Sequence, residues 1–132
     1  MKSSMPDYAL RKLASVAERH MEAMQIAVRY GVRIATGSDI FVSGAAMWGK
    51  NGLEASNLVK AGMTPLQAIE AATANGPATL GPQAPQSGLL AAGYDADVIA
   101  LDANPLEDIS ALGNPERVVG VWKAGVLVKE PS

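Results

Sequence analysis

The sequence contains no cysteine and a single histidine, His20, among 132 residues. Without a thiol, the chain can form neither a disulfide nor a thiolate zinc site, and it cannot use a cysteine nucleophile. One imidazole also cannot supply the two or three histidine ligands of a typical catalytic zinc site. A metal centre of that kind therefore cannot be built from this chain alone.

Long apolar runs and strongly charged stretches are also missing. No apolar run approaches the roughly 20 residues of a membrane-spanning helix, and the first residues do not have the pattern of a signal peptide. The net charge is −2, and the basic residues near the N-terminus are dispersed along one helical pattern instead of forming a basic patch. We therefore expect a cytoplasmic protein that binds neither membranes nor nucleic acid.

The first part of the chain has alternating helix and strand signals. Apolar residues three or four positions apart predict an amphipathic helix over residues 7–30, and β-branched residues predict a strand over residues 32–36. Two further helices are expected over residues 51–61 and 64–74. Thr64 and Gln67 form the pattern of a capping box at the start of the second of these. This order is typical of an α/β fold with a parallel sheet.

The character of the sequence changes at about residue 81. Helical periodicity ends there, and short strands are predicted over residues 88–91, 97–101, 117–123 and 126–129. The last two are separated by Ala124 and Gly125, which predict a two-residue hairpin turn. We therefore divide the chain into an αβ part, residues 1–81, and a β part, residues 82–132.

Asp39 is the first candidate for a functional residue. It directly follows the predicted strand over residues 32–36, in a Gly-Ser-Asp turn. In parallel sheets and barrels the carboxyl ends of the strands are where ligands bind. An aspartate at that place can bind a metal or act as a general base. The alternative is that Ser38 and Asp39 only stabilise a turn, as aspartate commonly does.

Other polar residues have simpler explanations. For His20, a position at the edge of the core is a better interpretation than metal ligation, because no second imidazole or thiolate is available. Asp95, Asp97 and Asp102 lack the glycine and the closing glutamate of a calcium loop, so turns and strand ends explain them better. Trp48 is most simply a core or interface residue, although it could line a pocket after Asp39.

Several motifs in a fixed order resemble the C-terminal third of the metal-dependent amidohydrolases. They are Gly-Ser-Asp at residues 37–39, the helix that begins near Asn51, and the residues 60–69, 71–75, 88–90, 93–99 and 104–109. The nearest branch is the imidazolonepropionase-like and Xaa-Pro dipeptidase (prolidase-like) group. The resemblance covers nearly the whole chain, and it is specific because the motifs occur in the family's order.

The resemblance implies a (β/α)8 barrel in which Asp39 stands at the end of the eighth strand. In the family this aspartate binds a divalent metal, usually zinc, and takes a proton from the metal-activated water that attacks an amide or peptide carbonyl. Residues 1–81 would then be the last helix-strand-helix unit of the barrel, and residues 82–132 would be strands of a composite β-sandwich. Phe41, Met47 and Trp48 are expected to form an apolar surface that faces either the substrate or the protein's own helices.

A complete barrel takes about 250 residues, so this chain cannot contain one. The family's other metal ligands come from earlier strands, and the histidine that many relatives have shortly before the residue matching Asn51 is replaced by Trp48. We therefore expect a C-terminal segment that alone binds no catalytic metal and hydrolyses nothing. Its expected partners are the missing N-terminal portion and a small amide, cyclic amide or dipeptide substrate, and a homo-oligomer is also possible.

A second hypothesis comes from a different class of function. The chain could be a non-catalytic αβ binding or assembly module that keeps the shape of the family without its chemistry. The two hypotheses differ in whether Asp39 is needed for turnover once the rest of the protein is present. An isolated helix-rich interaction domain is a poorer interpretation, because strand signals are closely spaced after residue 88.

Overall fold

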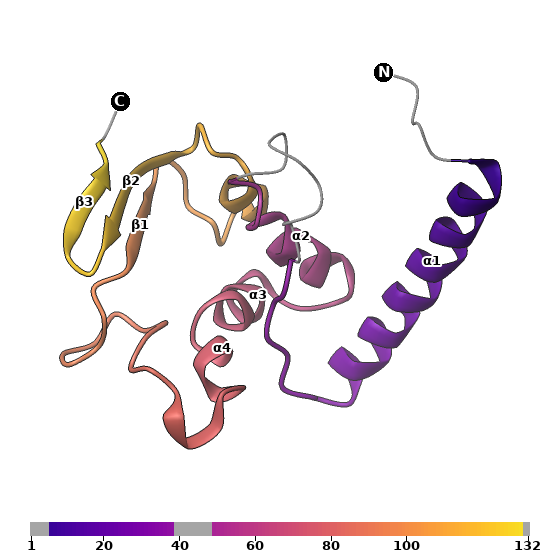
Figure 1. Ribbon diagram of the computed structural model, residues 1–132, viewed down its shortest axis with the longest axis horizontal. Helices are drawn as coiled ribbons and strands as arrows, with labels where there is room; N and C mark the ends of the chain where they lie inside the picture. Colours follow the sequence, from indigo (N-terminus) through magenta and orange to yellow (C-terminus); the bar gives the residue numbers. More distant parts are fainter. Residues whose placement is uncertain (1–5, 39–48, 131–132) are drawn as a thin grey trace.

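The computed structural model describes residues 6–38 and 49–130. Helices form the first part of the chain, and a small antiparallel sheet follows them (Figure 1). The helices are α1 (Asp7–Arg29), α2 (Leu53–Lys60), α3 (Pro65–Ala72) and α4 (Asn75–Ala78), with short 3-10 helices η3 (Gly81–Gln83) and η4 (Ile109–Gly113). The strands are β1 (Val98–Leu101), β2 (Val118–Lys123) and β3 (Val126–Lys129).

Helix α1 confirms the long amphipathic helix that the sequence predicts. It ends at Arg29, and Gly31 follows with a φ of 66°, a left-handed conformation that glycine adopts at little cost. The C-terminal half of α1 packs through Met24 against the core of the αβ part. Its N-terminal half projects away from the other helices (Figure 1), and Val16 there is 53% exposed.

The core of the αβ part lies between α2 and α3. Its buried members are small, and apart from one leucine all are alanines: Ala55, Leu58, Ala68 and Ala71. Helix α3 begins with the predicted capping box, in which the Thr64 hydroxyl accepts the Gln67 N–H and the Gln67 side chain accepts the Thr64 N–H. These reciprocal bonds satisfy backbone donors that the first turn of a helix leaves free.

The predicted strand over residues 32–36 is not a strand in the structure. The segment follows α1 and does not pair with any described strand. A β-branched sequence favours extended backbone, but a strand also needs a neighbour to accept and donate its ladder hydrogen bonds. The prediction is wrong for this chain because no such neighbour lies beside the segment in the described part.

The sheet has the order β1-β2-β3, with both pairs antiparallel. The predicted hairpin turn is confirmed: Ala124 and Gly125 both have positive φ, 50° and 78°, as a type I′ turn requires. The strand predicted over residues 88–91 is wrong. Gly88, with a φ of 81°, and the bends that follow it do not keep the extended backbone that a ladder needs.

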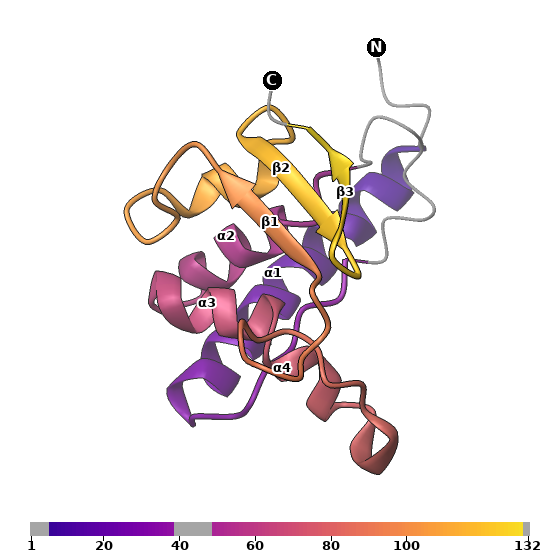
Figure 2. The same cartoon turned by 90° about the vertical axis from the view of Figure 1, so that its left-hand side faces the viewer.

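The elements form three layers. Helices α2 and α3 lie between the sheet on one side and α1 on the other, as Figures 1 and 2 show from two directions. The fold is therefore α/β, with its sheet in the C-terminal part. None of the helices in residues 6–38 and 49–130 is long and apolar enough to cross a membrane.

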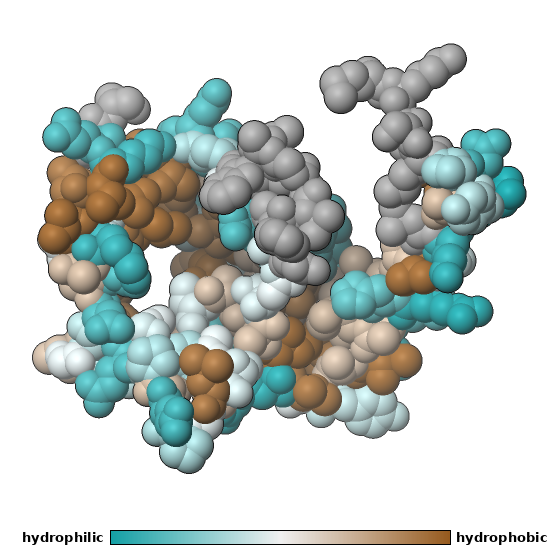
Figure 3. Space-filling view, viewed as in Figure 1, coloured by the Kyte–Doolittle hydropathy of each residue, from teal (hydrophilic) through white to brown (hydrophobic). Residues whose placement is uncertain are grey.

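The sheet carries an exposed apolar patch, which we define as Val126, Leu127 and Val128 of β3. Val126 is 65% exposed and Val128 is 62% exposed. Apolar atoms gather over this end of the sheet in the space-filling view (Figure 3). Successive strand residues normally point to opposite faces, so an apolar residue at every position is typical of a strand covered on both faces.

Candidate functional site

The segment over residues 32–38, which leads to Asp39, is fixed to the helical layer at two places. The backbone N–H of Thr36 donates to the carbonyl oxygen of Ala71 at 3.0 Å. The side-chain Nδ2 of Asn75 donates to the carbonyl oxygen of Ile34 at 2.9 Å. The end of α3 therefore provides an acceptor for this segment, and the start of α4 provides a donor.

A third, longer contact lies at the end of this segment. The Nδ2 of Asn51 lies 3.4 Å from the Oγ of Ser38, and both side chains belong to the surface. Asp39, Phe41 and Trp48, the three candidate site residues of the sequence, lie outside the described residues. The structure therefore describes the backbone that leads to Asp39 and the residues that fix it.

The described part of the chain does not fit a complete metal centre. Residues 6–38 and 49–130 contain no group of three or more histidine, cysteine, aspartate or glutamate side chains placed to hold a metal ion. His20 is exposed on α1, so its expected position at the edge of the core is wrong. A helical residue becomes buried only where another element covers its face, and none of the described elements covers this part of α1.

A cavity of about 440 Å³ lies between the sheet and the helical layer. Thr36, Ile69 and Thr73 line it from the helical side, and Ile99 and Val121 line it from the sheet. The lining is mostly apolar, and no described carboxylate or imidazole belongs to it. The cavity offers a largely apolar surface, and the described residues that line it include no acid or base apart from Lys129.

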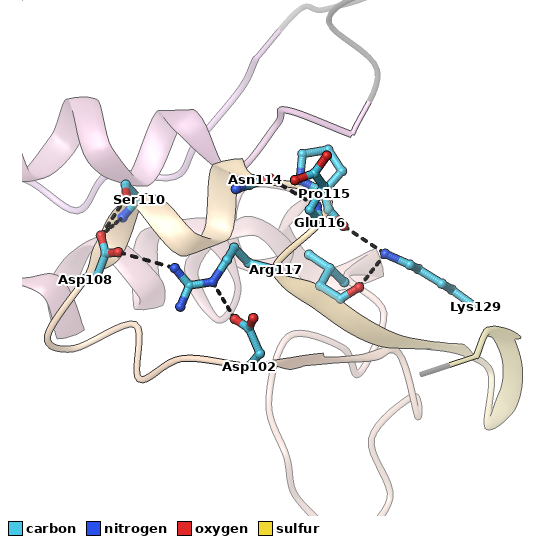
Figure 4. Close-up of polar contacts among 9 residues, drawn as sticks. Asp102, Asp108, Ser110, Asn114, Pro115, Glu116, Arg117 and Lys129 are labelled. Carbon is cyan, nitrogen blue, oxygen red and sulfur yellow. Dashed lines mark hydrogen bonds and ion pairs between the residues drawn. The ribbon is translucent and has the colours of Figure 1, made fainter. Parts of the chain in front are cut away.

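Lys129 serves a structural role at the edge of this cavity. Its Nζ donates to the carbonyl oxygens of Pro115 and Val118, the first at 2.8 Å (Figure 4). These bonds join the end of β3 to the residues that lead into β2. The ammonium group is therefore engaged by backbone oxygens and is not aimed at a substrate.

An ion-pair network stabilises the connection between β1 and β2. The Nε of Arg117 lies 2.5 Å from Oδ1 of Asp102, and this contact raises the pKa of the guanidinium (Figure 4). The hydroxyl and the N–H of Ser110 both donate to Asp108, which lowers the pKa of that carboxyl. Because each charged group has a local partner, we assign these residues to folding and not to catalysis.

Asp97 forms a second structural contact, at the hairpin between β2 and β3. It accepts hydrogen bonds from the Nζ of Lys123 and from the N–H of Ala124, which lower the pKa of its carboxyl. The roles of Asp97 and Asp102 are those that the sequence predicts, strand ends and turns. Neither carboxylate is directed toward a cation site in the described part.

Asn75 belongs to the motif over residues 71–75, but its hydrogen bond to Ile34 is not predictable from the sequence. The two partners are 41 positions apart, so no helical or strand period relates them. The available signal was an amide side chain directly after a capped helix, a place where asparagine commonly bonds to backbone groups.

Comparisons with known proteins agree on one family. Ochratoxinase of Aspergillus niger is 50% identical over 121 residues, which are 91% of this chain and 24% of that protein. The crystal structure of A. niger ochratoxinase matches with a TM-score of 0.79 and 47% identity, over 97% of this chain and 29% of that chain. The chain therefore spans about a quarter of the length of the curated relatives that it matches.

Another solved structure matches about as well. A Xaa-Pro dipeptidase with bound methionine in the active site has a TM-score of 0.79 and 33% identity, over 98% of this chain and 30% of that one. The sequence model of the amidohydrolase family matches residues 2–128, nearly the entire sequence. This chain belongs to the amidohydrolase family.

Proposed function

We propose that the chain is the C-terminal portion of a metal-dependent amidohydrolase that hydrolyses the C–N bond of a small amide, a cyclic amide or a dipeptide. The observation that carries this proposal is the family match over residues 2–128, in a chain that spans about a quarter of its relatives. In this proposal residues 1–81 contribute to the (β/α)8 barrel and residues 82–132 contribute to the β-sandwich.

Two features of the described residues support the proposal that another portion of the enzyme packs against this chain. The segment over residues 32–38 has a strand-like sequence but no strand beside it in the described part. The patch on β3 exposes apolar side chains that a folded protein normally covers. Both features are accounted for if the N-terminal portion of the same enzyme supplies the strands that pair with these elements.

Asp39 is the residue that this chain contributes to the reaction. We assign it two roles, as a ligand of the metal and as the carboxylate that takes up a proton during attack on the substrate carbonyl. The described residues cannot form the rest of a metal site, so the other ligands belong to the N-terminal portion. Phe41 and Trp48, nearby in sequence, are proposed to line the substrate site.

The test is a complemented enzyme, which we define as residues 1–132 joined to the N-terminal portion of A. niger ochratoxinase in place of the matching C-terminal residues. Its hydrolysis of ochratoxin and of Xaa-Pro dipeptides is compared with that of residues 1–132 alone. We expect turnover by the complemented enzyme and none by the isolated chain. A complemented enzyme that folds but hydrolyses none of these compounds would overturn the proposal.

Asp39→Asn separates the enzymatic proposal from the non-catalytic one. We expect this variant of the complemented enzyme to lose at least about a hundredfold in kcat, because general acid–base catalysis contributes roughly that much. Glu54→Gln on α2 removes the same charge and is the matched control. Unchanged turnover of Asp39→Asn would favour a binding or assembly module.

The metal and partner proposals are tested on the isolated chain. After incubation with zinc and removal of the excess, we expect less than stoichiometric metal on residues 1–132 and stoichiometric metal on the complemented enzyme. Size-exclusion chromatography of the isolated chain should show association or partial folding. A well-folded monomer with one tightly bound zinc ion would contradict both proposals.

A further inference from the structure

We propose that the cavity between the sheet and the helical layer is the docking site for uncharged, apolar side chains of the N-terminal portion of the enzyme. These side chains enter the cavity from a strand that pairs with the outer edge of β3. The inference rests on the proposed function, under which the N-terminal portion pairs with β3. It adds where the side chains of that portion go and what chemistry they have.

The cavity is larger than the voids that a folded enzyme leaves empty. Its volume is about 440 Å³, whereas packed interiors contain few voids larger than a water molecule. Figure 3 shows an opening between the apolar atoms of the sheet and the helical part of the chain. Because the cost of an empty apolar cavity grows with its volume, we expect another part of the enzyme to occupy this space.

The lining of the cavity favours an occupant without charge. Ile99 and Val121 line it from the sheet, and Ile99 is 50% exposed, so apolar surface there is still uncovered. The ammonium group of Lys129 already donates to the carbonyl oxygens of Pro115 and Val118. A charged occupant would lose its hydration among these apolar groups, whereas an aliphatic or aromatic side chain gains from burial there.

The register of the sheet connects the cavity to the edge of β3. Ile99 pairs with Val121, and Val121 pairs with Lys129, so these residues form one row across the three strands. All three line the cavity. Residues that are directly opposite each other in a sheet share a face. A residue opposite Lys129 on an added strand would therefore be the next member of the row and would face the same cavity.

The N-terminal portion is the occupant that accounts for both the cavity and the patch on β3. The residues that match ochratoxinase are 24% of that protein, so most of its length lies outside the match. Val126 and Val128 of the patch are more than half exposed beside the cavity-lining row. One added strand would cover the patch and would also direct alternate side chains toward the cavity.

The first test measures whether the cavity is closed to a reagent. The chain contains no cysteine, so one introduced thiol reports on its own surroundings. Ile99→Cys reports on the cavity, and Leu106→Cys is the matched control, because Leu106 is also 50% exposed but does not line the cavity. The unmodified complemented enzyme gives the background from cysteines of the ochratoxinase portion.

We expect a maleimide to label Ile99→Cys at least about tenfold more slowly in the complemented enzyme than in residues 1–132 alone, because the occupant protects the thiol. Leu106→Cys should be labelled at nearly the same rate in both proteins. Equal labelling rates of Ile99→Cys in the two proteins would overturn the inference.

The second test uses the sign of a change in stability. Ala72 is the last residue of α3 and lines the cavity, so Ala72→Trp adds a large side chain there. In a filled cavity the indole overpacks, and the thermal midpoint of the complemented enzyme should fall by at least about 2 °C. Ala78→Trp, the same substitution at an exposed position of α4, should change it by less than half as much.

An unchanged or higher thermal midpoint for Ala72→Trp would mean that the cavity of the complemented enzyme is vacant, and it would overturn the inference. Ala72→Leu covers the case in which the tryptophan variant does not fold. Its added volume is smaller, so the thermal midpoint should change in the same direction by a smaller amount.

The outcomes separate this inference from the proposed function. If the complemented enzyme folds but is inactive, the proposed function fails, while labelling and the thermal midpoint still test docking. If it is active and Ile99→Cys is not protected, only the inference about the cavity fails. A complemented enzyme that does not fold would count against both.

Two other occupants would give different labelling results. Fast labelling of Ile99→Cys in the complemented enzyme that slows when toluene is added would indicate a pocket for a small apolar ligand. Labelling of the isolated chain that slows as its concentration rises, with no further slowing in the complemented enzyme, would indicate a second copy of the chain. Either result would overturn the inference.

Discussion

Gly52 and Leu112 approach so closely that a Cβ on Gly52 would lie 1.9 Å from the carbonyl oxygen of Leu112. Gly52 precedes α2, and Leu112 belongs to η4, in the part of the chain that leads to β2. The contact is backbone against backbone, so no side-chain rotation can relieve an added methyl group. It joins the helical part of the chain to the β part at a point where only glycine fits.

Gly52→Ala should therefore destabilise the protein by about 3 kcal/mol, the upper end of typical overpacking costs. The backbone of Gly52, with a φ of −64°, suits alanine, so the cost is steric and not conformational. Gly76→Ala in α4 is the control, because a Cβ there meets nothing within 4 Å. Urea unfolding of the complemented enzyme measures both, and equal midpoints would contradict the prediction.

The hairpin turn offers a stabilising substitution. Ala124 has a φ of 50°, a left-handed conformation that costs an ordinary residue roughly 1 kcal/mol and suits asparagine better. Ala124→Asn should stabilise the protein by about 0.5 to 1 kcal/mol. Ala91→Asn, in an exposed bend, should have a smaller effect. A lower thermal midpoint for Ala124→Asn than for the unmodified protein would contradict this prediction.

The contact of Asp97 with Lys123 and Ala124 makes the hairpin sensitive to pH. Because folding lowers the pKa of Asp97 below its usual 3.8, the stabilisation is complete above that pH and is lost as the pH falls through the lowered value. Folding also raises the pKa of Lys123 above its usual 10.5, so the ammonium contribution is complete below that pH and is lost as the pH rises through the raised value.

Asp97→Asn should therefore be less stable than the unmodified protein at neutral pH, and the difference should disappear in acid. Thermal midpoints measured from pH 7 downward test this. Glu18→Gln on α1 removes the same charge at an exposed position and should show no such convergence. A constant difference between Asp97→Asn and the unmodified protein at every pH would argue against an ionic contribution.

Removing the capping box at α3 should lower the stability of the fold by a predictable amount. The Thr64 hydroxyl accepts the Gln67 N–H at 3.3 Å. Thr64→Ala leaves this donor unsatisfied and should destabilise the protein by about 1 kcal/mol. Thr64→Ser keeps the hydroxyl and should recover most of the loss in denaturant unfolding. Equal losses in the two variants would mean that the methyl group of Thr64, and not its hydroxyl, matters.

Local features of the fold were predictable from the sequence where the physical cause is itself local. The period of α1, the Thr64 cap and the Ala124 turn each depend on residues within a few positions of one another. The strands predicted over residues 32–36 and 88–91 failed for the opposite reason. A strand is completed by hydrogen bonds to a distant partner, which the local sequence does not specify.

The candidate site divides in the same way. Asp39 was identified by its place after a β-branched segment and by the family motif around it, both of which are readable along the chain. The bond from Asn75 to Ile34 spans 41 positions and became apparent only when α4 was placed beside the segment. A candidate residue with a local sequence signal was thus easier to predict than a hydrogen bond between two distant segments.

Because β3 is exposed, the order in which the segments of the protein are synthesised affects whether this strand is covered during folding. In a polypeptide made from its N-terminus, β3 is the last strand of this chain to leave the ribosome, and any earlier portion is then already able to fold. If the covering strands belong to that earlier portion, Val126 and Val128 meet them as soon as they emerge. Made without it, two copies of the chain would offer each other the same unpaired edge, and sheet-to-sheet aggregation would compete with folding.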